Sequence, residues 1–206
     1  MKVFDENEVA KMFIDNELFD TKTEVIWRDL ARLTEKDEVP REDINRMFAE
    51  SEKHLELVFH RFIGGRGKKK IKIYVNGNQL KIIDPFFTDH PATQALTEEP
   101  IEINGEKVVI KPYILPHFSK LSPSEEKELS GAEGYLKNQG FYVYRNERLI
   151  IFGTWFNIIK YGELIKLARI QIDIGNSLDQ EFRITLDKSN AQIPAKLRAR
   201  LKTIIN

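Results

Sequence analysis

Three two-residue turns between alternating apolar segments constrain the fold of this chain more than any other feature of its sequence. They are Asn76-Gly77, Asn104-Gly105 and Asn146-Glu147, inside the segments 69–83, 101–115 and 140–153. Asn-Gly between two such segments is a strong signal of a β-hairpin, because both central residues of the turn adopt positive φ angles. The sequence therefore predicts a series of antiparallel hairpins.

Helical signals separate these hairpins. Apolar residues recur at helical spacing from Asp43 to Ile63, and a glycine pair then ends the pattern. A second helix is expected over 122–129, with Ser122 as N-cap and Pro123 at the first helical position. Further helices are expected at 6–14, 160–167 and 195–205, and further strands at 23–30, 167–174 and 181–187. The predicted class is α+β, a hairpin-rich mixed sheet with packed helices.

Composition excludes several classes of function. The 206 residues carry 32 basic and 32 acidic side chains, so overall charge gives no reason to expect nucleic acid or an anionic membrane as a partner. The absence of cysteine excludes disulfides, thiolate metal sites and cysteine nucleophiles. The acidic N-terminus does not resemble a signal peptide, and the chain has no apolar segment of membrane-spanning length. We expect a cytoplasmic protein with no membrane partner.

The sequence contains no recognisable catalytic constellation. Its four histidines are scattered, and His54 and His60 stand six apart, a spacing that does not place them on one helical face as metal ligands. The segment 64–70, GGRGKKK, lacks the spacing of a phosphate-binding loop. The simpler interpretation is a helix stop followed by a basic strand. The alternative is contact with a nucleic-acid backbone through the local cluster of Arg66, Lys68, Lys69, Lys70 and Lys72.

The hairpin 140–153 offers two interpretations. Strand alternation predicts that Phe141, Val143 and Leu149 face a core, whereas a second set of side chains projects the other way. That second set is Tyr142, Tyr144, Arg145 and Arg148. It is either the outer face of a packed hairpin with a solvated arginine pair, the favoured interpretation, or a ligand site.

Several segments in the same order resemble one family. They are GFYVYRNERLI (140–150), KLARIQIDI (166–174), NSLD (176–179) and KSNAQIP (188–194). Upstream, TEVIWRDLARL, HLELVFHRFI and DPFF agree in order. Together they resemble the second half of a prokaryotic group of GHKL ATPases, the superfamily of gyrase, the heat-shock chaperone, histidine kinases and mismatch-repair MutL. The resemblance covers about residues 22–205.

The resemblance implies a division of the chain and a role for one lysine. Residues 1–30 would hold an N-terminal segment and the last strand of an ATP-binding domain that is otherwise missing, and 31–206 a transducer domain with a ribosomal-protein-like fold. ATP and magnesium would bind only with the missing domain, so the isolated chain is expected to be inactive. In the family, a transducer-loop lysine reaches the γ-phosphate, and Lys188 stands at that position. It is either that lysine or an ordinary solvated loop residue.

Three functions follow as hypotheses. The first is a transducer that couples the ATP state of a partner domain, in the same or another chain, to a pathway acting on DNA, such as repair or phage defence. The second is a stand-alone nucleic-acid-binding module, which uses the 66–72 cluster and the basic final helix with Lys196, Arg198, Arg200 and Lys202. The third, an unrecognised hydrolase, ranks last. Candidate partners are therefore an ATP-binding domain, DNA, and a second copy in a dimer.

Overall fold

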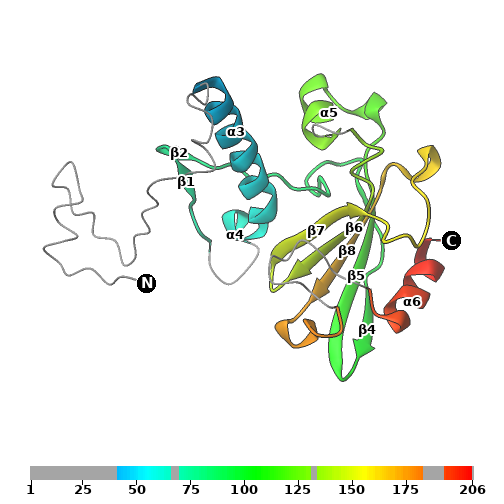
Figure 1. Cartoon of the computed structure of the whole chain (residues 1–206). Helices are drawn as coiled ribbons and strands as arrows, with labels where there is room; N and C mark the ends of the chain where they lie inside the picture. Colours follow the sequence, from blue (N-terminus) through cyan, green and yellow to red (C-terminus); the bar gives the residue numbers. More distant parts are fainter. Residues whose placement is uncertain (1–40, 66–69, 131–133, 183–192, 206) are drawn as a thin grey trace, which may run out of the picture. The chain divides into compact units, whose positions relative to one another are not determined.

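The computed structural model describes residues 41–65, 70–130, 134–182 and 193–205, and the fold of these residues is α+β as predicted (Figure 1). The chain divides into two units, 1–45 and 46–206, and the second contains the whole sheet. The expected helix 6–14, the expected strand 23–30 and the expected boundary at residue 30 lie outside the described residues.

A six-stranded mixed sheet forms the centre of the second unit. Its strands are β3 (Gln94–Ala95), β4 (Glu99–Ile103), β5 (Glu106–Ile114), β6 (Gly140–Arg145), β7 (Arg148–Thr154) and β8 (Ala168–Ile174). Their order is β3-β5-β8-β6-β7, and β4 also pairs with β5. Strand β6 pairs with β8 in parallel, and the other pairs are antiparallel. The ends of β6 and β8 therefore lie side by side.

All three predicted turns are confirmed. Asn76, Asn104, Asn146 and Glu147 have φ angles of 50°, 51°, 46° and 69°, and the two glycines are also positive. The first hairpin is shorter than predicted, because its ladder contains only β1 (Tyr74–Val75) and β2 (Asn78–Gln79). It forms a separate two-stranded sheet.

Within the described residues, the helices match the sequence signals with one exception. The predicted helix 43–63 forms α3 (Arg41–Val58) and α4 (His60–Gly64), with a break at Phe59 and a left-handed cap at Gly65. Helix α5 (Pro123–Ser130) begins after Ser122, whose backbone N–H donates to Glu125 while its hydroxyl accepts from the Glu125 N–H. Helix α6 spans Ala195–Ile205.

The predicted helix at 160–167 is wrong. Gly162 is extended (φ −158°, ψ 154°), and only a 3₁₀ turn, η2 (Glu163–Ile165), follows it. Two further 3₁₀ turns are η1 (Phe118–Lys120) and η3 (Asn176–Leu178). Of the predicted strand 181–187, Glu181 and Phe182 lie in a turn, and the rest falls outside the described residues.

Both faces of the sheet are buried. One face, which includes Phe141 and Val143, packs with Leu197 and Leu201 of α6. The opposite face carries a second cluster that comprises Phe86, Tyr113, Tyr142, Tyr144 and Leu149, with Leu57 of α3 against it. Figure 1 shows α6 beside the sheet near β4 and β5. Among the described residues, no helix is both long and apolar enough to cross a bilayer.

In the hairpin 140–153, two expectations from the sequence were wrong, one about the face of Leu149 and one about the two arginines. Leu149 lies on the tyrosine face, because it pairs directly with Tyr144, and paired residues point to the same side of a sheet. Tyr142 and Tyr144 do point away from Phe141, but they are 2% and 0% exposed. The arginines are not a solvated pair either, since Arg145 binds Asp179 and Arg148 lies over the Phe59 ring.

Candidate functional site

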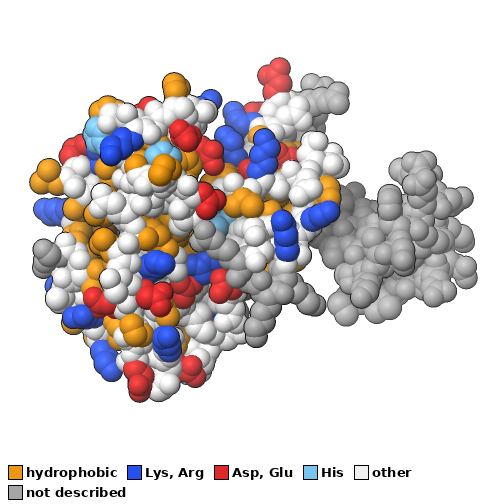
Figure 2. Space-filling model, turned by 180° about the vertical axis from the view of Figure 1, so that it is seen from behind, with side chains coloured by type: hydrophobic (Ala, Val, Ile, Leu, Met, Phe, Trp, Pro, Cys, Tyr) orange, Lys and Arg blue, Asp and Glu red, His pale blue; other side chains and the backbone are white. Residues whose placement is uncertain are grey.

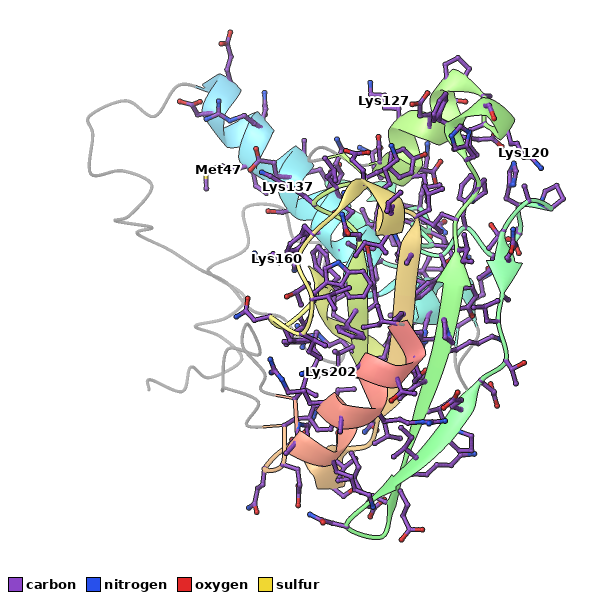
Figure 3. All side chains as sticks on the ribbon, turned by 90° about the vertical axis from the view of Figure 1, so that its right-hand side faces the viewer. Met47, Lys120, Lys127, Lys137, Lys160 and Lys202 are labelled. Atoms are coloured by element: carbon purple, nitrogen blue, oxygen red, sulfur yellow. The ribbon has the colours of Figure 1, made fainter. Side chains whose placement is uncertain are left out.

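Only some of the basic residues that the sequence analysis singled out are among the residues that the structure describes. Lys188, Arg66, Lys68 and Lys69 lie outside the described residues, so their predicted roles stay predictions. Lys70 and Lys72 are exposed. On the face shown in Figure 2, basic and acidic side chains are interspersed. The lysines labelled in Figure 3 project from separate elements, such as Lys127 on α5 and Lys202 on α6.

Most basic side chains of α6 have partners in the fold. Lys196 donates to the Glu102 carbonyl at 2.8 Å, and Arg198 donates to the Asn157 carbonyl at 3.1 Å. Arg200 donates to the Glu99 carboxylate at 2.7 and 3.0 Å. These contacts hold α6 on strand β4 and on the loop after β7.

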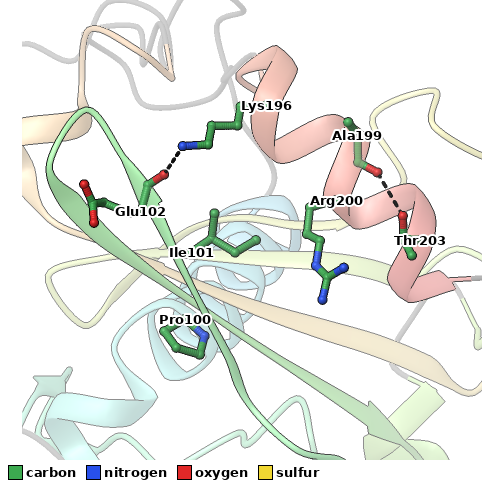
Figure 4. Close-up of a pocket in the computed structure, with 7 residues that line it drawn as sticks. All are labelled: Pro100, Ile101, Glu102, Lys196, Ala199, Arg200 and Thr203. Carbon is green, nitrogen blue, oxygen red and sulfur yellow. Dashed lines mark hydrogen bonds between the residues drawn. The ribbon is translucent and has the colours of Figure 1, made fainter.

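An open groove runs between β4 and α6 (Figure 4). It has a volume of about 560 Å³ and is lined by Pro100, Ile101, Glu102, Lys196, Ala199, Arg200 and Thr203. Its two cations are already engaged, by the Glu102 carbonyl and by the Glu99 carboxylate. The carboxylates of Glu102, which lines the groove, and of Glu99 balance the charges of Lys196 and Arg200, so the groove has no net charge that would select a ligand.

Four side chains, Arg61, Tyr144, Glu147 and Asp173, form a connected polar cluster, named here the Arg61 cluster. Arg61, on α4, is 7% exposed and forms ion pairs with Asp173 and, at 2.9 Å, with Glu147. Its guanidinium carbon lies 3.4 Å from the centre of the Tyr144 ring, a cation–π contact. One side chain thus connects α4 with β6, with the hairpin turn and with β8.

Electrostatics stabilises the charged form of Arg61. Burial alone would lower the pKa of its guanidinium, but the hydrogen bond and charge of Asp173 outweigh that effect, with smaller contributions from Tyr144 and Glu147, and raise it. Burial raises the pKa of the Tyr144 hydroxyl well above its ordinary value, and the charge of Arg61 opposes this only in part. The cluster therefore combines a permanent cation with a neutral phenol.

A second set of contacts secures the chain just after β8. Arg145 donates to both carboxylate oxygens of Asp179, at 2.6 and 2.5 Å. The backbone N–H of Asn146 donates to the Ile174 carbonyl at 3.1 Å. The hairpin turn 146–147 is therefore bound both to the end of β8 and to the chain that follows it.

A histidine extends the cluster toward the loop after β2. His60 has Nδ1 2.7 Å from the Leu57 carbonyl oxygen and Nε2 3.4 Å from the Tyr144 hydroxyl. Asp84 accepts hydrogen bonds from the backbone N–H groups of Phe86 and Thr88, both at 3.0 Å. Burial alone would raise the pKa of Asp84, but these bonds, the Thr88 hydroxyl and the charge of His60 lower it.

The Arg61 cluster connects separate elements of the fold through paired charges. Among the described residues, no group of three or more His, Asp or Glu side chains could hold a metal ion. Arg61 pairs with both carboxylates of the cluster, Glu147 and Asp173, and so joins α4 to the hairpin turn and to β8.

Sequence reasoning did not find the Arg61 cluster. The available signal was an arginine between Phe59 and Ile63 in a helix segment rich in apolar residues, where a buried charge needs a partner. Its partners Glu147 and Asp173 are 86 and 112 positions away, so the sequence could not identify them.

Comparisons with known proteins assign the chain to no family. No protein-family model matches the chain, and neither the curated proteins nor the solved structures gave a significant match.

Proposed function

We propose that this chain is the transducer portion of a GHKL-type ATP-binding protein, and that it couples the ATP state of a partner domain to action on DNA, such as repair or phage defence. The observation that carries the proposal is the Arg61 cluster, which connects α4 to the end of β8 through paired charges. The sequence segments that resemble the family's second half support the same function.

The proposed coupling follows the order of the chain. Helices α3 and α4 come after the segment that resembles the last strand of the ATP-binding domain. The cluster connects α4 to Asp173, and the Arg145–Asp179 pair holds the chain nine residues before Lys188. A displacement of α4 would therefore act on the chain that leads to Lys188. In this proposal, ATP and magnesium belong to the partner domain, and the protein works in the cytoplasm.

Reconstitution with the ATP-binding domain tests the proposal. The isolated chain should neither bind nor hydrolyse ATP, whereas the complex should turn ATP over. Lys188→Ala should lower turnover at least tenfold, about 1.4 kcal/mol of barrier, with ATP affinity nearly unchanged. Lys188→Arg should restore little of the lost turnover, because the planar guanidinium of arginine does not replace the compact ammonium charge of lysine. Lys202→Ala, on the exposed side of α6, is the matched control. Equal turnover of wild type and Lys188→Ala would contradict the role of this lysine.

A stand-alone nucleic-acid-binding module is the second candidate, favoured by the exposure of Lys70 and Lys72. Fluorescence anisotropy with duplex DNA should then show binding at 50 mM salt that weakens steeply as salt rises. Replacing both lysines with alanine should reduce the salt dependence. Absence of binding at low salt would remove this candidate.

A further inference from the structure

Two of the hairpin turns are Asn-Gly pairs with almost the same local sequence and conformation. Asn76-Gly77 follows Val75. Asn104-Gly105 follows Ile103, so a β-branched residue precedes each asparagine. The φ angles are 50° and 79° in the first turn and 51° and 82° in the second, and all four turn residues are exposed. The two turns therefore differ chiefly in what holds them closed.

The second turn is anchored in the central sheet. The amide nitrogen of Asn104 donates to the Glu181 carboxylate at 2.8 Å. Strands β4 and β5 on either side of this turn are paired at five positions, and Ile103, directly before it, is 3% exposed. Strand β5 also pairs with β8 over six positions. Opening of this turn would therefore break a side-chain hydrogen bond and disturb buried residues.

The first turn is held by far fewer contacts. Strands β1 and β2 are paired at two positions and form a separate sheet. One further bond, from the Leu80 N–H to the Ile73 carbonyl at 2.9 Å, continues the hairpin. Among the described residues, the Asn76 side chain has no hydrogen-bond partner. A hairpin of two strands is only marginally stable by itself, so this turn should open at a lower free energy than the second one.

We propose that Asn76 is a site of spontaneous deamidation, and that it is converted to aspartate and isoaspartate well before Asn104. The backbone nitrogen of Gly77 attacks the side-chain carbonyl carbon of Asn76. A C–N bond forms between these two atoms, and the bond to the side-chain amide nitrogen breaks. That nitrogen leaves as ammonia, together with the proton of the Gly77 N–H. Water then opens the resulting succinimide ring at either carbonyl, so the reaction needs no oxidant or reductant.

The closed turn slows this reaction. The ring forms only after the backbone of Asn76 has rotated to bring the Gly77 nitrogen against the side chain, and a closed hairpin turn fixes that backbone. The rate therefore follows the population of the open turn. The isoaspartate product adds one carbon to the backbone between two strands that are paired at only two positions, so the β1–β2 pairing should be lost. The site does not depend on the transducer function.

Peptide mass spectrometry of the full chain tests the proposal. Folded wild type is incubated at mildly alkaline pH, sampled over time and digested with trypsin, which places the two turns in separate peptides, 73–81 and 82–107. Asn76 should convert roughly tenfold faster than Asn104, which corresponds to about 1.4 kcal/mol of opening free energy. Glu181→Ala should raise the rate at Asn104 and leave the rate at Asn76 unchanged, because it removes the acceptor of the Asn104 amide.

The same chain unfolded in guanidinium chloride is the reference. There the two asparagines have nearly the same neighbours, so they should convert at equal rates. Three results would overturn the proposal. The first is conversion of Asn104 in the folded protein at the rate of Asn76 or faster. The second is conversion of both residues in the unfolded chain but of neither in the folded protein. The third is faster conversion of Asn76 that persists in the unfolded chain, which would assign the difference to local sequence.

Discussion

Arg61 and Asp173, 112 positions apart in the sequence, form an ion pair that holds helix α4 against the end of strand β8. Both Asp173 carboxylate oxygens accept from the guanidinium, and Gln171 donates to one of them at 2.5 Å. Because Arg61 also lies on the Tyr144 ring, its position is fixed from several directions. The contact is therefore suited to transmit a displacement between the helix and the sheet.

The two carboxylates of Arg61 should differ in their effect on stability. The Asp173 side chain is 26% exposed and that of Glu147 46%. Asp173→Asn should lower the free energy of unfolding by about 2 kcal/mol, less than for a fully buried pair because of solvent screening. Glu147→Gln should cost less than about 1 kcal/mol. Urea unfolding of both variants measures the difference, and equal losses would argue against the dominance of Asp173.

Gly140 should tolerate no side chain. Its φ angle is +117°, and a Cβ would lie 2.6 Å from the Thr154 carbonyl oxygen on the paired strand β7. Gly140→Ala should therefore destabilise the protein by about 3 kcal/mol, because backbone strain and a backbone clash combine. Gly77→Ala is the matched control, since Gly77 has φ +79° but a Cβ there would meet nothing within 4 Å, and should cost about 1 kcal/mol. Thermal unfolding that ranks the two variants equally would contradict the clash.

Local signals predicted local structure well in this chain. The Asn-Gly turns and the Ser122-Pro123 helix start depend on a few adjacent residues, and the structure confirms them. The prediction of a helix at 160–167 was wrong, because the conformation of this segment depends on a distant residue. The Gly162 N–H donates to the Gln139 side chain at 3.2 Å, and the chain there is extended.

Long-range pairing limited what could be predicted of the site. The parallel pairing of β6 with β8 brings Tyr144 beside Asp173, and no local pattern specifies it. Arg61 joins them from a helix more than 80 positions upstream of Tyr144. The sequence predicted the hairpin turns, whereas the partners of the buried arginine required the tertiary structure.

Gln139 should be essential to the packing of the chain that follows β7, where it contacts Trp155 and Gly162. It is fully buried, and its side-chain oxygen accepts from the Trp155 indole N–H at 3.0 Å and from the Gly162 N–H. Its amide donates to the Leu136 carbonyl at 2.8 Å. Gln139→Met should cost about 2–3 kcal/mol, because it leaves buried polar groups without partners. Gln79→Met, on the exposed strand β2, should change the unfolding midpoint little in the same denaturant experiment.

Asp84 should make stability depend on acid pH. Hydrogen bonds from Thr88 and Phe86 and the charge of His60 outweigh burial and lower its pKa in the folded state. The folded pKa therefore lies below the unfolded value of about 3.9. The resulting stabilisation is complete above the unfolded pKa and is lost as pH falls through the folded pKa.

Asp84→Asn tests this contribution, because the amide carries no charge. Its single oxygen can also accept from only one side of the loop, since the Phe86 and Thr88 N–H groups donate to different carboxylate oxygens, and that loss does not vary with pH. The free energy of unfolding should be higher for wild type than for Asp84→Asn near pH 5, and the difference should shrink progressively as pH falls toward 2. Asp89→Asn, an exposed carboxylate of the same loop, is the matched control and should leave the acid-unfolding curve unchanged. A difference between wild type and Asp84→Asn that stays constant with pH would mean that the charge of Asp84 is not what stabilises this loop.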